Sequence, residues 1–139
     1  VGGLLYLLIE LLWRGWSHWT MFVLGGLCFV YLGLINEVLC WDTPLWEQVL
    51  IGASGITALE FVTGCVVNLW LGWGVWDYSG LPGNIMGQIC LQYTVLWVLV
   101  SLAGIILDDW IRYRAFGEER PRYNVGLARH SKRVVWMPR

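Results

Sequence analysis

The stretch QVLIGASGITALEFVTGCVVNLWL, residues 48–71, decides the fold class. It is apolar along its whole length except for Gln48, Glu60, Asn68 and a few small hydroxyl side chains. A bilayer core of about 30 Å needs roughly 20 helical residues to cross it. The stretch therefore predicts a transmembrane helix, and it puts the carboxyl of Glu60 near the middle of the membrane.

Three more apolar stretches predict further helices. Residues 87–107 are long enough to span, and residues 20–36 are at the short limit. Residues 2–13 span only if their helix continues through Arg14 to about residue 19, with the Arg14 side chain reaching toward the headgroups. The alternative is three spans and a first segment that only dips into the bilayer.

We therefore predict an all-α integral membrane helical bundle with about four transmembrane helices and a basic cytoplasmic tail at residues 113–139. The predicted spans are residues 2–19, 20–36, 48–71 and 87–107.

Composition agrees with this class. The chain is 58% hydrophobic, has 14% charged residues and a mean hydropathy of +0.59, outside the usual soluble range. Nine of its 11 tryptophans cluster at the ends of the predicted spans, as amphipathic rings at the headgroup level do. Only Trp97 and Trp136 depart from this pattern.

Charge is segregated along the chain and predicts the orientation. Residues 1–109 hold one basic side chain, Arg14, against eight acidic ones, whereas residues 110–139 hold eight basic side chains against two acidic ones. Because basic residues next to a span stay on the cytoplasmic side, we predict a multi-pass plasma-membrane protein with a cytoplasmic C-terminus. The loop around Asp77 then faces outside. Nucleic-acid binding is not expected, since the basic tail accompanies no known motif.

Polar side chains gather where the fourth span is predicted to begin. Asn84, Gln88 and Gln92 recur every four residues, so a helix starting near Pro82 would carry them on one face. Lipid offers these amides no partner, and the third span carries Glu60 and Asn68 on one face with Gly64 between them. We predict that the two polar faces meet.

Glu60 is the central candidate residue. A charge at the bilayer centre costs about 2.5–3.5 kcal/mol, so Glu60 is expected to be protonated, hydrogen-bonded to the Gln88 and Gln92 face, or turned to a hydrated cavity. The functional hypothesis is a route for substrate or ions, and the structural alternative is interhelical packing. The residues of the predicted route are Glu60, Asn68, Asp77, Asn84, Gln88 and Gln92.

Other positions have separate predicted roles. Arg14, with His18, is a candidate contact for an anion or lipid headgroup, although a local ion pair with Glu10 is the simpler interpretation. The glycines expected to let helices approach closely are Gly26, Gly33, Gly64 and Gly87. No metal site and no cofactor are predicted, since neither histidine has a second ligand at metal spacing and the four cysteines form no C-x-x-C pair.

No catalytic motif and no nucleotide-binding loop occur in the sequence, so we do not expect an enzyme. If ATP drives any process here, a separate ATPase subunit would hydrolyse it.

Three motifs carry a family resemblance: Glu60-x-x-x-Gly64, then Trp76-Asp77-Tyr78-Ser79, then Asn84-x-x-Gly87. Together with residues 10–37, they resemble the bacterial family labelled putative type IV ABC-transporter permease, and in particular its short Gram-positive and prophage-borne members. The resemblance covers about residues 4–112. It implies a small permease or transporter component and carries over no substrate and no residue role.

The leading hypothesis is therefore a transporter component in the lipid bilayer that forms a homo-oligomer, because four spans are few for a transport route. The alternatives are a holin-like or structural membrane assembly, and a protein that binds lipid at the outer face.

Overall fold

The computed structural model describes residues 1–39 and 43–126, and the regular elements within these residues are helices, with no β-strand. The predicted all-α class is confirmed. The helices are α1 (Gly2–Arg14), α2 (Trp19–Val38), α3 (Leu45–Gly64) with its π-helical continuation η1 (Cys65–Trp70), and α4 (Leu91–Phe116).

Two of these helices are long and apolar enough to cross a membrane. Leu45–Trp70 and Leu91–Phe116 have 26 residues each, which corresponds to about 39 Å of helix. Only 33% and 28% of their most apolar windows are buried inside the protein. A core helix of a soluble protein would bury most of this surface, so these two helices are suited to lipid.

The first span was predicted to continue through residues 15–19, and this part of the prediction is wrong. Helix α1 ends at Arg14 after 13 residues, because Gly15 adopts a left-handed conformation (φ 74°) and its N–H bonds to the carbonyl of Leu11. His18 then caps the next helix, its ring nitrogen accepting from the backbone N–H of Thr20. The helix α1 is about 20 Å long, shorter than a bilayer core. A complete first span stays a prediction.

The predicted helix start near Pro82 is also wrong. Helix α4 begins at Leu91, because Gly83 and Gly87 have left-handed backbones (φ 66° and 71°) and Met86 between them has φ 55°. These conformations interrupt a right-handed helix. The helix instead continues to Phe116, nine residues beyond the predicted end at 107. The first residues of the predicted tail are thus helical, and residues 127–139 lie outside the described part of the chain.

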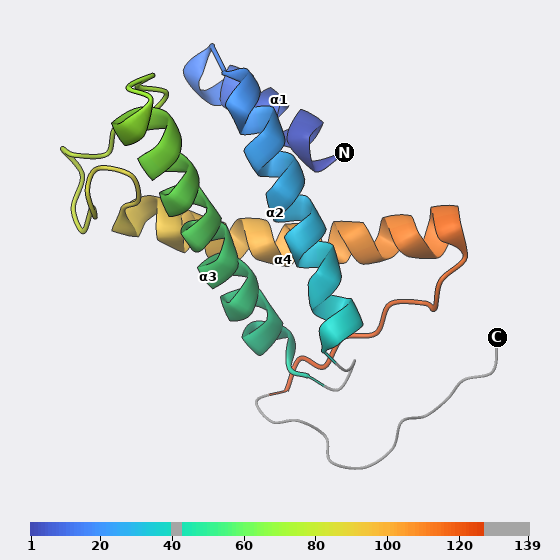
Figure 1. The fold of residues 1–139 in the computed structure, drawn as a ribbon. Coiled ribbons are helices and arrows are strands. Elements are labelled where there is room, and N and C mark those ends of the chain that lie inside the picture. The colour runs from blue at the N-terminus through green and yellow to red at the C-terminus, as the bar shows by residue number, and fades with distance from the viewer. Residues whose placement is uncertain (40–42, 127–139) are drawn as a thin grey trace.

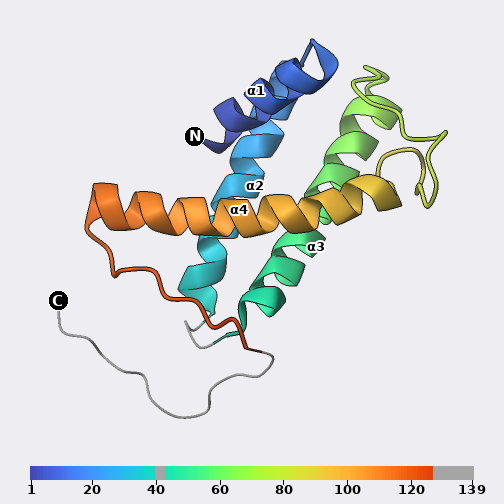
Figure 2. The ribbon, with the colours of Figure 1, turned by 180° about the vertical axis from the view of Figure 1, so that it is seen from behind.

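The helices form a crossed bundle. Helices α2 and α3 run side by side, α1 folds back along α2, and α4 crosses both (Figures 1 and 2). Near its start α4 contacts α3, where Trp97 meets Glu60, and near its end it contacts α2, where Asp108 lies against Gly33. After α4 the chain returns to the start of α3, where the N–H of Leu45 bonds to the carbonyl of Asn124 (2.7 Å).

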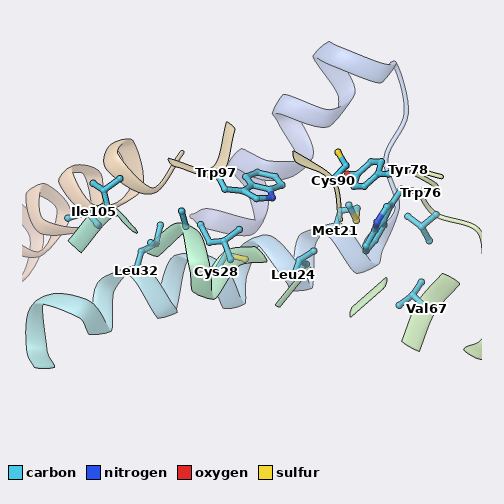
Figure 3. Packing of buried hydrophobic residues seen from close by; sticks show 14 of the residues in the cluster. Met21, Leu24, Cys28, Leu32, Val67, Trp76, Tyr78, Cys90, Trp97 and Ile105 are labelled. Atoms are coloured by element: carbon cyan, nitrogen blue, oxygen red, sulfur yellow. The ribbon is translucent and has the colours of Figure 1, made fainter. Parts of the chain in front are cut away.

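An apolar core fills the space between the helices. Trp97, Cys28 and Leu32 lie in one part of it, and Tyr78, Trp76 and Cys90 gather in another (Figure 3). The second group comes from the 71–90 loop, the segment between η1 and α4. Because this loop contributes core residues, it is part of the packed structure.

Glycines bring α1 and α2 into close contact. A side chain at Gly25 would collide with Tyr6, at 2.5 Å from its Cβ, and one at Gly3 would collide with the backbone of Phe22. The neighbouring Gly26, one of the four glycines predicted to allow close packing, has nothing within 4 Å of the position that a Cβ would occupy. That prediction is wrong by one residue, which on a helix is a rotation of about 100°.

Replacing each of these adjacent glycines with alanine tests the contact. We expect Gly25→Ala to lower the free energy of unfolding by about 1–3 kcal/mol through overpacking. Gly26→Ala should be neutral or stabilise by about 0.5–1 kcal/mol, because alanine favours the helix. Thermal unfolding in detergent, followed by circular dichroism, measures both. Equal effects of the two substitutions would contradict the close approach at Gly25.

Candidate functional site

The carboxyl of Glu60 is the most deeply buried charged group that the described residues contain. Glu60 lies on α3 and is 2% exposed. Its Oε2 accepts a hydrogen bond from the indole Nε1 of Trp97 (2.8 Å), and its Oε1 accepts one from the hydroxyl of Tyr78 (3.1 Å). These three residues, here called the Glu60 centre, join α3, α4 and the 71–90 loop.

The donors of the Glu60 centre are held by packing. The ring of Tyr78 stacks on that of Tyr93, with centroids 4.8 Å apart and planes 15° from parallel. The ring of Trp97 lies 6.2 Å from that of Tyr6. Burial, followed by the nearby Glu60 carboxyl, raises the pKa of Tyr78, so its hydroxyl keeps its proton and remains a donor.

A second polar group lies two turns further along the same helix. The side-chain amide of Asn68 donates to Gln88 Oε1 (2.8 Å), and Asn68 Oδ1 accepts from the backbone N–H of Val75 (2.6 Å). The indole of Trp76 donates to the backbone carbonyl of Gln88 (3.0 Å). Between this group and Glu60, Gly64 leaves room for the amide: its Cβ would lie 2.6 Å from Gln88 Oε1.

The rest of the loop is built from short-range polar contacts. Asp77 accepts hydrogen bonds from both the hydroxyl and the backbone N–H of Ser79, and these bonds lower the pKa of Asp77. Asn84 donates to the carbonyls of Ser79 (3.1 Å) and Leu81 (2.9 Å). Gly87 packs against this turn: a Cβ there would come within 2.6 Å of Ser79 Oγ.

Arg14 and His18 lie beside this loop. Arg14 forms an ion pair with Glu10 (Nε to Oε2, 2.8 Å), and its guanidinium lies over the ring of Trp16 at 4.8 Å. It also makes a long hydrogen bond, 3.5 Å, to the carbonyl of Val75. The ring of His18 contacts Trp73, with centroids 5.7 Å apart. Both residues thus connect the α1–α2 turn with the 71–90 loop.

The structure brings together fewer of the predicted route residues than expected. Glu60 is bonded to Tyr78 and Trp97 and not to the amides, so the predicted contact with Gln88 and Gln92 is wrong. Gln88 bonds to Asn68 instead, and Gln92 is exposed on the first turn of α4. Because residues 84–88 are not helical, the four-residue spacing does not put the three amides on one face.

The pattern of polar residues in the sequence does not predict the two residues that donate hydrogen bonds to Glu60. Tyr78 lies in the predicted outer loop, and Trp97 lies in the middle of a predicted span. Trp97 did carry a signal, since it was one of two tryptophans away from the predicted span ends. A buried indole needs an acceptor, and a buried carboxyl needs a donor.

Another polar cluster lies at the far end of α4. Arg112 is within 2.7 Å of Asp108 and 2.6 Å of Glu37 on α2, and it lies 3.6 Å from Glu118. Gly33 makes room for this cluster: a Cβ there would lie 2.7 Å from Asp108 Oδ2. Together the ion pairs join the end of α4 to the end of α2.

Within residues 1–39 and 43–126, no group of three histidine, cysteine or acidic side chains is placed to hold a metal ion. The cysteines described there, Cys28, Cys65 and Cys90, are free thiols.

The sequence model of the family described as putative ABC-transporter type IV matches residues 4–118. The chain belongs to this family. The match covers α2, α3, η1, α4, the 71–90 loop and all but the first two residues of α1. Together with the two membrane-length helices it identifies an ABC-transporter-related membrane protein. No solved structure matches the chain.

The hydrogen bond from Tyr78 to Glu60 in this type IV family member can be tested by comparing the Tyr→Phe substitution at position 78 with the same substitution at position 93. Tyr78→Phe keeps the stacked ring and removes the donor, so we expect the free energy of unfolding to fall by about 1–3 kcal/mol. Tyr93→Phe alters the other ring of the same stack and leaves the Glu60 centre intact, so it should change stability by less than about 0.5 kcal/mol. Thermal unfolding in detergent measures both, and equal losses would contradict the Tyr78–Glu60 bond.

Proposed function

We propose that this type IV family member is a small multi-pass component of a transport system, and that Glu60 is an intramembrane group that responds to protons or cations. The observation that carries the proposal is an acidic side chain buried in a membrane-length helix and bonded to two donors from different segments. An acid at such a position is a functional candidate by default, because a membrane helix is more stable without it.

The chemistry of the two donors suggests how protonation acts. An ionised carboxylate accepts from both Tyr78 and Trp97, whereas a protonated carboxyl has an O–H that must itself find an acceptor. The Trp97 indole is a donor only, but a tyrosine hydroxyl both donates and accepts. Proton uptake by Glu60 would therefore reorganise the bond to Tyr78 and leave the bond to Trp97 in place.

The segment that would move is then the 71–90 loop, which carries Tyr78. Asp77 and Asn84 are exposed on this loop, and Tyr78 connects it to Glu60. We propose that the route to Glu60 runs from Asp77 and Asn84 past Tyr78. Gln88 and Asn68 flank it as a pair that anchors the loop to η1. This route replaces the one through Gln92.

A proton-flux assay tests this function. The purified protein is reconstituted into liposomes that contain a pH-sensitive dye, and a potential is applied. We expect flux above that of protein-free liposomes for the wild type and near-background flux for Glu60→Gln, which keeps the shape but cannot change charge. The control is Glu119→Gln, an exposed acid after α4, which should match the wild type.

Two results would count against the proposal. One is equal flux in the wild type and Glu60→Gln. The other is background flux in every sample, since the Glu60 centre would then serve only to hold the helices together.

We further propose that the working unit is a homo-oligomer and that ATP hydrolysis, where used, comes from a separate subunit. One chain has four helices, and α1 is only about 20 Å long. A single chain therefore encloses little space for a substrate or ion route. Light scattering coupled to size exclusion in detergent should give a protein mass at least twice that of one chain. A mass of 15.9 kDa would contradict the oligomer.

A further inference from the structure

An apolar pocket lies between α1, α2 and α4, on the side of Trp97 away from the loop. Its volume is about 190 Å³. The floor is made of buried side chains, including Cys28, Leu32 and Ile56, and Trp97 forms one wall. Figure 3 shows Cys28, Leu32 and Trp97 facing the same part of the core. At the rim, Leu5 and Ile9 are exposed apolar side chains of α1.

The lining determines what can enter the pocket. Glycines form part of the wall and let the helices around the pocket approach closely: a Cβ on Gly104, for example, would collide with Leu32. Apart from the Tyr6 hydroxyl, the lining side chains present little polar surface, because the Trp97 indole already donates to Glu60. Water needs two to four polar partners and is poorly held here.

The volume of the pocket can be compared with that of known apolar cavities. A slender hydrocarbon fits, and apolar protein cavities of roughly 150 Å³ bind small hydrocarbons such as benzene. The rim continues into exposed apolar surface on α1 and on the membrane-length helix α4.

We propose that this pocket binds one acyl chain of a membrane lipid, which enters between α1 and α4. An acyl chain fills the space beside Trp97 with the van der Waals contacts that an empty pocket lacks. The chain then supports the ring that donates to Glu60. This inference rests on the pocket and stands whether or not Glu60 takes part in transport.

Photolabelling tests the proposal. The protein is reconstituted into phosphatidylcholine vesicles that contain a phosphatidylcholine with a diazirine on one acyl chain, irradiated, and mapped by mass spectrometry. Exposed residues are labelled in any case, so the decisive positions are Cys28 and Ile56, which are 8% and 3% exposed. We expect lipid adducts there at five-fold or more the level at Val67, which is 6% exposed and lies outside the pocket.

Two variants sharpen the result. Ala103→Phe extends a ring from a pocket-lining position and should reduce the floor adducts at least five-fold. Ala58→Phe, on an exposed face of α3, should leave them unchanged. The wild-type measurement is decisive even if Ala103→Phe does not fold. Floor adducts no more abundant than those at Val67 would overturn the proposal, as would equal labelling in folded Ala103→Phe.

Discussion

The hydrogen bonds that Glu60 accepts from Tyr78 and Trp97 are the interactions on which the rest of this structure depends. Burying a carboxyl among apolar helices costs several kcal/mol unless it is hydrogen-bonded, and no single helix supplies the donors. The acid on α3 can be buried only when α4 and the 71–90 loop are both in place. One side chain thereby couples three segments that are distant in sequence.

The 71–90 loop follows from this requirement. To bring Tyr78 onto Glu60, the chain must leave η1, turn back and then start α4, and it does so with left-handed backbone at Gly83 and Gly87. Several polar side chains of the loop and of η1 also hold this turn together. Asn84 binds loop carbonyls, and Asn68 holds the backbone at Val75 while its amide bonds to Gln88. The loop is therefore an ordered cap on the bundle.

Polar interactions and apolar packing both join the helices. The acid of the Glu60 centre lies within α3, the contacts of Arg14 lie at the end of α1, and Arg112 bridges Asp108 and Glu37 near the ends of α4 and α2. Helix α4 crosses α2 and α3 beside small residues such as Gly52 on α3, where a Cβ would lie 3.1 Å from Ser101 on α4 and 2.8 Å from Leu32 on α2. The crossing leaves space for the pocket beside Trp97, which α1 also lines.

The sequence by itself determined the helical class, the membrane-length helix around residues 48–71 and the position of Glu60 within it, because runs of apolar residues and a lone acid within them are local properties. It did not determine the partners of Glu60. The spacing of Asn84, Gln88 and Gln92 predicted one helical face, but the glycine conformations between them end that face before α4 begins. Which donor reaches a buried carboxyl depends on where distant segments pack, and only the tertiary structure decided that it is Tyr78 and Trp97.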